Sequence, residues 1–166
     1  MTGVGEGPGY GDRRLPGRVA GCDLGLVMYC VILDAGKGDI STMDISKITD
    51  YLYIAARLRT RDKELVGALD DLDVGLVINM IAFHRAPRSV RESAREVLWL
   101  WTIDSPLTPI PVRTLMRGVE AAVPVIERGS SVLVYCNAGR HRSVAMASAV
   151  LIARGHPAQE AMDLIR

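Results

Sequence analysis

The chain has 166 residues, of which 49% are hydrophobic and 23% charged, and its formal net charge at pH 7 is +1. This length suits one domain that can bury a core without disulfides or metals, and the composition is globular rather than disordered. The small net charge does not indicate DNA binding, and Cys22, Cys30 and Cys136 do not have the spacing of a zinc site. The apolar run 24–33 is too short to span a bilayer as a helix and lacks a cleavage site, so we expect neither stable membrane insertion nor a signal peptide.

The N-terminal quarter differs in composition from the rest. Residues 1–21 are rich in glycine and arginine, and we expect a flexible tail there. Residues 22–44 are predicted to be an extension that packs on the core, with a buried strand or docked segment over 24–33 and a turn over 34–39. Residues 45–166 are then predicted to form the main folded domain.

Strands and helices are predicted to alternate along this domain. Apolar, β-branched runs predict strands at 51–55, 75–81, 97–101 and 131–135. Apolar residues at helical spacing predict helices at 62–72, 111–128, 144–153 and 157–166. This alternation indicates an α/β fold with a central, mostly parallel sheet flanked by helices.

The inward faces of three helices can be assigned from the same spacing. They are Leu65, Leu69 and Leu72; then Val112, Leu115, Val119, Val123 and Ile126; then Ala158, Ala161, Met162 and Ile165. Pro124 lies inside the second of these helices and should kink or shorten it, because proline lacks the backbone N–H that a helix uses. Trp99 and Trp101 are expected in the core, where one of them could shape the loop that follows.

The most informative segment runs from Val132 to Ser143. A β-branched run ends at Cys136, and Arg142 and Ser143 then open a predicted helix. A thiol at the start of a helix should ionise more readily than a free thiol, whose pKa is about 8.5. The backbone amides of the loop and the planar guanidinium of Arg142 can bind an oxyanion, and Gly139 allows the tight turn that such a loop needs.

Cys136-x5-Arg142-Ser143 resembles the phosphate-binding loop of the cysteine-dependent protein tyrosine phosphatases, and its residues look most like the dual-specificity branch. Segment 101–107 resembles the general-acid loop of that family, with Asp104 lying 32 residues before Cys136. Segments 48–55 and 77–80 resemble strands of the family's catalytic core. The resemblance covers about 45–166 and implies a protein tyrosine phosphatase-like fold of the dual-specificity type.

The resemblance also implies roles for individual residues. Cys136 is the expected nucleophile, Asp104 the acid that protonates the leaving group and then helps to activate water, and Ser143 a donor to the Cys136 sulfur that aids its departure. Arg142 is expected to act in both catalysis and phosphate binding. The substrate-binding loop would consist of Asn137, Ala138, Gly139, Arg140, His141 and Arg142. No metal or other cofactor is expected.

The predicted function is metal-independent hydrolysis of phosphomonoesters through a cysteinyl-phosphate intermediate. The expected partner is a phosphorylated protein, with phosphotyrosine as the first choice and phosphoserine or phosphothreonine as further substrates. One alternative keeps the chemistry but changes the substrate to a phosphoinositide, phosphatidylglycerophosphate or an RNA 5′ phosphate. Another is a catalytically inactive phosphate-binding module. A cytoplasmic location is expected because a thiolate nucleophile must stay reduced, and the oligomeric state is left open.

Three features of the sequence are each compatible with two roles. Ser143 can also cap the helix, and Asn79 can either brace the active loop or form a strand-end turn. Segment 84–96 carries four arginines and is either a solvated helical face or a basic rim that attracts anions. Arg57, Arg59 and Arg61 could extend that rim.

Two features depart from the family pattern. Members usually have a histidine directly before the cysteine, where this chain has Tyr135, so the loop must be braced in another way. In addition, 30 residues follow Cys136, where relatives commonly add a further helix. The domain is therefore either a minimal version of the fold or short at its C-terminus.

Overall fold

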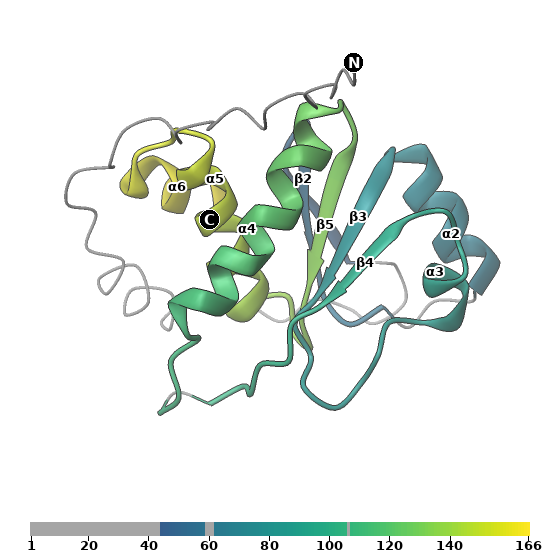
Figure 1. Ribbon diagram of the computed structural model, residues 1–166, viewed down its shortest axis with the longest axis horizontal. Helices are drawn as coiled ribbons and strands as arrows, with labels where there is room; N and C mark the ends of the chain where they lie inside the picture. Colours follow the sequence, from purple (N-terminus) through teal and green to yellow (C-terminus); the bar gives the residue numbers. More distant parts are fainter. Residues whose placement is uncertain (1–43, 59–61, 106) are drawn as a thin grey trace, which may run out of the picture.

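The computed structural model describes residues 44–58, 62–105 and 107–166. These described residues form a five-stranded sheet of order β1-β2-β5-β3-β4, in which β1 and β2 are antiparallel and the other neighbours are parallel (Figure 1). The strands are β1 (Ile45–Thr49), β2 (Leu52–Ala55), β3 (Val74–Asn79), β4 (Glu96–Trp99) and β5 (Ser131–Tyr135). The predicted α/β fold with a mostly parallel sheet is confirmed. The expected tail and extension, together with Cys22 and Cys30, lie outside the described residues.

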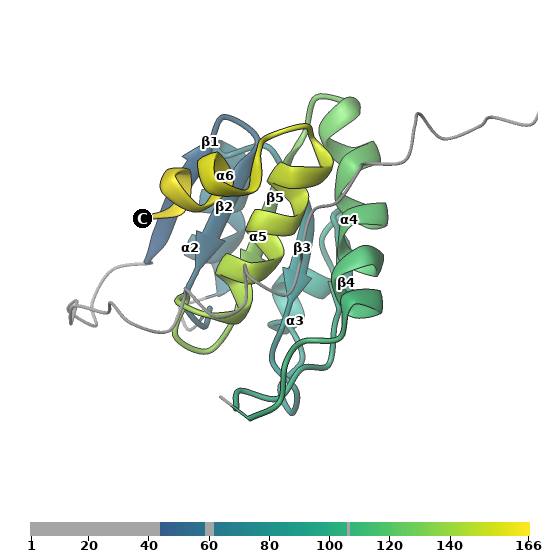
Figure 2. The same ribbon diagram turned by 90° about the vertical axis from the view of Figure 1, so that its left-hand side faces the viewer.

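Helices cover both faces of the sheet, because each parallel connection must cross over it. On one face lie α4 (Val112–Glu127), α5 (Arg142–Ala153) and α6 (Ala158–Ile165), with α6 packed on α5; on the other lie α2 (Asp62–Asp71) and α3 (Arg88–Arg91) (Figures 1 and 2). The carboxyl ends of β2, β5 and β3 meet at one edge, and β5 lies in the middle.

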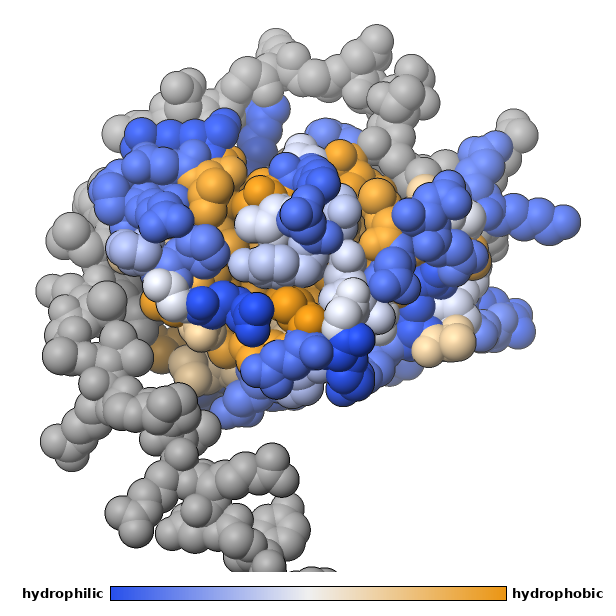
Figure 3. Space-filling view, turned by 90° about the horizontal axis from the view of Figure 1, so that it is seen from above, coloured by the Kyte–Doolittle hydropathy of each residue, from blue (hydrophilic) through white to orange (hydrophobic). Residues whose placement is uncertain are grey.

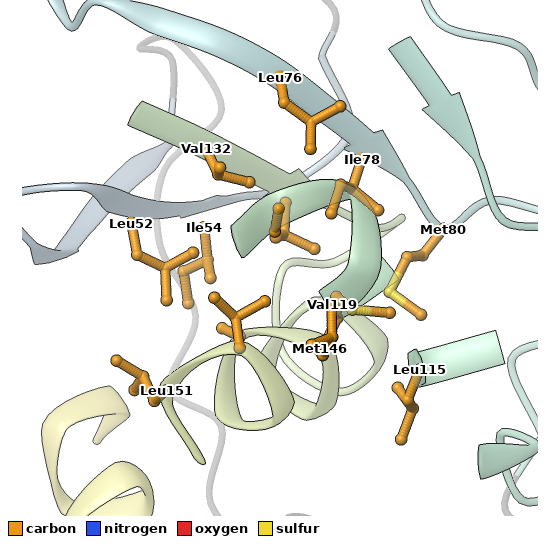
Figure 4. Packing of buried hydrophobic residues seen from close by; sticks show 14 of the residues in the cluster. Leu52, Ile54, Leu76, Ile78, Met80, Leu115, Val119, Val132, Met146 and Leu151 are labelled. Atoms are coloured by element: carbon orange, nitrogen blue, oxygen red, sulfur yellow. The ribbon is translucent and has the colours of Figure 1, made fainter. Parts of the chain in front are cut away.

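Side chains along the central strands alternate between two buried layers. Leu76, Ile78, Val132 and Val134 pack against α4 and α5, and Figure 4 shows the first three on the side of the sheet that faces the helices carrying Val119 and Met146. Val77, Leu133 and Tyr135 belong to the second layer, on the side of α2 and α3. Because successive strand residues project to opposite faces, Tyr135 faces α2 and α3 whereas Cys136 belongs to the layer under α4 and α5.

Helix α4 corrects two sequence expectations. It passes through Pro124 and ends at Glu127, so the expectation that the proline shortens it is wrong. Pro124 is exposed, and solvent can therefore satisfy the carbonyl that the proline leaves without a donor. Val112, predicted to face inward, is 52% exposed in the first turn, whereas Leu115, Val119 and Ile126, predicted for the same face, are buried.

Other differences lie at the edges of the sheet. Strand β1 pairs with β2 in antiparallel orientation, and a short turn at Asp50 connects them. The sequence does not predict β1 as a separate strand. The predicted helical face in 84–96 is reduced to the single turn α3, with Val90 buried. Trp99 and Trp101 are 38% and 52% exposed and do not belong to the core. They lie where β4, an edge strand, ends and the chain leaves the sheet.

The end of the molecule at which β5 begins lies opposite the edge where the parallel strands end. Seen from that end, hydrophilic residues form most of the margin and apolar residues show between them (Figure 3). A hollow of about 420 Å³ near the start of β3 is lined by residues that include Asp70, Asp73 and Arg95. Arg95 forms an ion pair with Asp70 there, so the charges in this hollow are mixed.

Candidate active site

The segment singled out by the sequence lies at the carboxyl end of β5. The strand ends at Tyr135, Cys136 follows, and α5 begins at Arg142. The loop between them is held by the neighbouring strand β2: the Cys136 amide donates to the Ala55 carbonyl at 3.3 Å, and the Arg57 amide donates to the Asn137 carbonyl at 3.3 Å. The strand–loop–helix arrangement predicted from the sequence is therefore present.

Gly139 is required by the way this loop packs. Its φ of +73° lies in the left-handed region, and a Cβ added there would approach the Ala56 amide nitrogen to 2.9 Å. Backbone atoms at that distance cannot move aside cheaply, and a side chain at positive φ is itself strained. The loop can therefore pass this close to the end of β2 only with glycine at this position.

The Cys136 thiol is buried, with 2% of the residue exposed, and its Sγ lies 3.4 Å from the Ser143 hydroxyl. Burial alone raises the pKa of this thiol. Hydrogen bonds from the Ser143 side chain, from the Ser143 and Ala138 backbone and the charge of Arg142 act in the opposite direction, and the net pKa lies below that of an ordinary thiol. The contact expected between Ser143 and the sulfur is thus present.

Ser143→Ala is expected to raise the pKa of Cys136, because it removes the strongest interaction that lowers it. Alkylation of the thiol by iodoacetamide, measured against pH, should then begin at higher pH than in the parent chain. Ser148→Ala is the matched control, because Ser148 is also buried on α5 but its hydroxyl contacts Met162 instead. Equal alkylation profiles for Ser143→Ala and the parent would contradict this assignment.

Arg142 is buried, with 5% exposed, and links three segments of the chain. Its Nη1 donates to the carbonyls of Met80 at 2.7 Å and Thr102 at 3.1 Å, which lie just beyond β3 and β4. Its Nη2 donates to Asp104 Oδ2 at 2.9 Å, whereas its Nε is buried without a partner. Backbone carbonyls therefore fix the Nη1 side of the guanidinium. On the opposite edge, Nε remains available as a donor beside Nη2.

Asp104 reaches the loop from the segment that follows β4. Its side chain is 46% exposed, and besides Arg142 it lies 3.9 Å from His141 Nδ1. The structure thus brings Asp104 to the guanidinium of Arg142, although the two residues are far apart in sequence. Of the remaining loop residues, Asn137, Ala138 and His141 are exposed and Gly139 and Arg140 half-buried.

Thr102 is a supporting residue that sequence reasoning missed. It is 4% exposed, and its Oγ1 donates to the Met80 carbonyl at 2.7 Å. The same carbonyl oxygen also accepts a hydrogen bond from Arg142 Nη1. Its own carbonyl accepts the second bond from Arg142. A threonine outside any regular element gives no sequence signal of this kind, because its role depends on the pairing of β3 with β4.

Comparisons with known proteins agree with this architecture. No family model matches the chain, and no curated protein gives a significant match. Among solved structures, a mouse protein classed as a dual specificity phosphatase is 24% identical with a TM-score of 0.65, covering 80% of this chain and 79% of its own. Human DUSP28 is 20% identical with a TM-score of 0.65, covering 77% and 82%. PTPMT1 is 26% identical with a TM-score of 0.61, covering 73% and 80%.

This agreement in fold accompanies the Cys136-x5-Arg142-Ser143 loop, which lies at a strand-to-helix junction. The chain has a protein tyrosine phosphatase-like fold of the dual-specificity type. Similarity to these structures supports phosphatase-type activity.

Tyr135 occupies the position that is usually histidine in the family that the loop resembles. It cannot brace the active loop, because its side chain points to the opposite face of the sheet from Cys136. The backbone does so instead, through the bonds from Cys136 and Arg57 described above and a third from the Met80 amide to the Tyr135 carbonyl at 3.0 Å. The Tyr135 hydroxyl is buried and has no hydrogen-bond partner among the residues that the structure describes.

Tyr135→Phe is expected to leave the free energy of unfolding unchanged or to raise it by roughly 1 kcal/mol, because a buried hydroxyl without a partner is itself unfavourable. Chemical denaturation measures this directly. The control is Tyr51→Phe, which removes a hydroxyl placed 3.4 Å from His156 Nε2 and should not stabilise the chain. A clear loss of stability in Tyr135→Phe alone would mean that the hydroxyl has a stabilising partner.

Asn79 serves the strand end rather than the phosphatase loop. Its Oδ1 accepts from the Ile81 amide at 2.9 Å and its Nδ2 donates to the His84 carbonyl at 2.7 Å. The second of the two sequence readings, a strand-end turn, is therefore the one observed.

Groups of side chains that could hold a metal ion, and helices that could span a membrane, are both absent from the described residues. Among residues 44–58, 62–105 and 107–166, no group of three or more His, Cys, Asp or Glu side chains is arranged to hold a metal ion. In the same part of the chain, no helix combines the length and the apolar character needed to cross a membrane.

Proposed function

We propose that this protein hydrolyses phosphomonoesters through a cysteinyl-phosphate intermediate, and that its substrates are phosphotyrosine proteins, with phosphoserine and phosphothreonine as further substrates. The observation that carries the proposal is the set of contacts joining Cys136, Ser143, Arg142 and Asp104 at one edge of the sheet. This reaction needs a thiol with a lowered pKa, an arginine with a buried N–H that is free to bind phosphate, and a carboxyl group close to that arginine.

In the first step, the Cys136 thiolate attacks phosphorus and the bond to the leaving oxygen breaks. The amides of 137–142 and the Nε and Nη2 of Arg142 hold the equatorial oxygens. Asp104 transfers its proton to the leaving oxygen. The buried position of Cys136 in the layer under α5 directs its sulfur to the start of that helix, where partial positive charge favours the thiolate.

In the second step, water attacks the cysteinyl phosphate and the S–P bond breaks. Asp104, now a carboxylate, takes a proton from the water, and the Ser143 hydroxyl, 3.4 Å from the sulfur, stabilises the departing thiolate. The thiolate is restored and inorganic phosphate is released. The chain's own residues thus supply every group that this sequence of steps uses.

The direct test is hydrolysis of p-nitrophenyl phosphate and of a phosphotyrosine peptide by the full chain in the presence of EDTA. We expect turnover of both substrates. Phosphate on Cys136, detected by mass spectrometry after rapid acid quenching, should accompany it. Absence of turnover on both substrates under reducing conditions would contradict the proposal.

A second substrate class has one specific observation in its favour. PTPMT1, which is 26% identical over 73% of this chain, has also been solved in complex with PI(5)P. We therefore include phosphoinositide head groups in the substrate panel. A higher kcat/KM for them than for every phosphopeptide would transfer the same chemistry to lipid phosphates.

A further inference from the structure

Large apolar side chains are exposed together at the end of the molecule where the active loop lies. Three segments reach this end: the loop that follows β3, the loop that follows β4 and the first turns of α4 (Figures 1 and 2). We call their exposed apolar residues the apolar face, and they are Phe83, Trp101, Ile103, Leu107, Val112 and Met116. Apart from Trp99 at the end of β4 and Leu164 on α6, these are all the large hydrophobic residues that the described chain exposes.

The aromatic part of this face is held in place by contacts within the protein. The rings of Phe83 and Trp101 meet edge to face with their centroids 5.6 Å apart, which joins the loop after β3 to the loop after β4. The Trp99 indole nitrogen donates to the Ile81 carbonyl at 2.7 Å and so ties the end of β4 to the same loop. Docking on this surface would therefore require little ordering of the protein.

The most exposed members of the apolar face have little protein around them. Leu107 is 90% exposed and Phe83 is 79% exposed, and they come from two different loops. The core of a protein–protein interface needs close packing and matched shape. A lipid surface is fluid and accepts protruding side chains without a matching pocket, and Trp, Phe and Leu are the residues that enter it. The shape and composition of the face therefore favour a lipid surface.

The charged residues around the apolar face are almost all basic. The Arg85 guanidinium is exposed and lies over the Trp99 ring, 5.4 Å from its centroid. Arg113 and Arg117 are exposed one turn apart on α4, and neither forms a salt bridge with the residues that the structure describes. Segments 80–91 and 100–119 contain one acidic residue, which is the Asp104 that pairs with Arg142. Apolar side chains interspersed with cations complement a membrane that carries negative charge.

We propose that the apolar face, together with Arg85, Arg113 and Arg117, docks on the surface of an anionic membrane. The apolar side chains enter the boundary between head groups and acyl chains, and the arginines bind the charged groups of the lipids. Such a contact is peripheral and needs no membrane-spanning helix. It does not depend on the hydrolytic activity proposed above. Because the active loop lies at the same end of the molecule, docking holds that loop close to the membrane surface (Figure 1).

The intrinsic fluorescence of the protein provides a direct test. The chain has two tryptophans, Trp99 and Trp101, and both are exposed beside or within the apolar face. Vesicles of about 70% phosphatidylcholine and about 30% phosphatidylserine should shift the emission of the full chain to shorter wavelength. Lipids brominated in their acyl chains should quench it. Binding to vesicles of phosphatidylcholine alone should be weaker, because no lipid charge then attracts the arginines.

Two double variants test the two kinds of contact separately. Phe83→Ser combined with Leu107→Ser should lower the partition coefficient for the charged vesicles, measured by cosedimentation, by about tenfold or more, because two apolar side chains no longer enter the lipid. Arg113→Gln combined with Arg117→Gln should lower it by about tenfold, because two cations are lost from the lipid surface.

Matched controls alter the same residue types on other parts of the surface. Leu164→Ser removes an exposed apolar side chain from α6. Arg128→Gln combined with Arg154→Gln removes two exposed cations that follow the ends of α4 and α5, at the end of the molecule opposite the active loop (Figure 1). Both controls should keep the partition coefficient of the parent chain.

Several outcomes would overturn this inference, and none of them bears on hydrolysis of soluble substrates. The first is the absence of both a spectral shift and cosedimentation with the charged vesicles. The second is binding that the variants of the apolar face do not weaken, or that the controls weaken as much. A clear fall in the thermal midpoint of Phe83→Ser/Leu107→Ser would mean that the chain itself covers these side chains. A dimer of the parent chain that this variant dissociates would assign the face to a second copy of the protein.

Discussion

Cys136→Ser is expected to reduce turnover of p-nitrophenyl phosphate by at least about 10⁴-fold, as removal of a covalent nucleophile does in other enzymes. A serine hydroxyl remains protonated at neutral pH in the surroundings that favour the Cys136 thiolate. The substitution is nearly isosteric, and Cys136 is 2% exposed in the core, so the fold should persist. Steady-state kinetics at substrate saturation measures the loss.

Binding separates a chemical effect of this variant from a structural one. Inorganic phosphate should raise the thermal midpoint of Cys136→Ser about as much as that of the parent chain, because Arg142 and the loop amides remain in place. The Ser148→Ala variant, altered on the same helix, should keep both activity and binding. Retained turnover in Cys136→Ser would exclude this residue as the nucleophile, whatever the binding result.

Asp104→Asn is expected to have opposite effects on turnover and on oxyanion binding. Turnover of substrates with poor leaving groups should fall by about 10²–10⁴-fold, the usual contribution of a general acid. Binding of inorganic phosphate should become tighter, because Asp104 Oδ2 accepts from Arg142 Nη2 at 2.9 Å and so competes with a phosphate oxygen for the same donor. Kinetics with a series of aryl phosphates and calorimetric titration of phosphate measure the two effects.

The pH dependence of turnover is a second test of the Asp104→Asn variant. The rate of the parent chain should fall at high pH because the acid must hold its proton, and this basic limb should disappear in Asp104→Asn. The acidic limb, which depends on the Cys136 thiolate, should remain. Asp163→Asn, which alters an exposed carboxylate on α6, is the control and should change neither limb. An unchanged basic limb in Asp104→Asn would mean that another group supplies the proton.

The sequence predicts the local parts of this protein well. The strand–loop–helix around Cys136, the contact from Ser143 to its sulfur and the order of most strands and helices follow from patterns within a few residues. Such patterns are reliable because strand alternation, helical periodicity and the amide-rich start of a helix are properties of contiguous chain. The same reasoning places Trp99 and Trp101 in the core, which is wrong, because hydrophobic character alone does not say which strand lies at the sheet edge.

The sequence by itself therefore determined which groups we propose to react, since the proposed nucleophile, the arginine and the serine lie within eight consecutive residues. Only the tertiary structure decided how they are held. Placing β5 between β2 and β3 brings the Met80 and Thr102 carbonyls to Arg142 and the end of β2 to Gly139. It also turns Tyr135 away from the loop towards the side of α2 and α3, because strand geometry sends adjacent side chains to opposite faces. The order of strands in a sheet depends on contacts between distant segments, and no local pattern contains it.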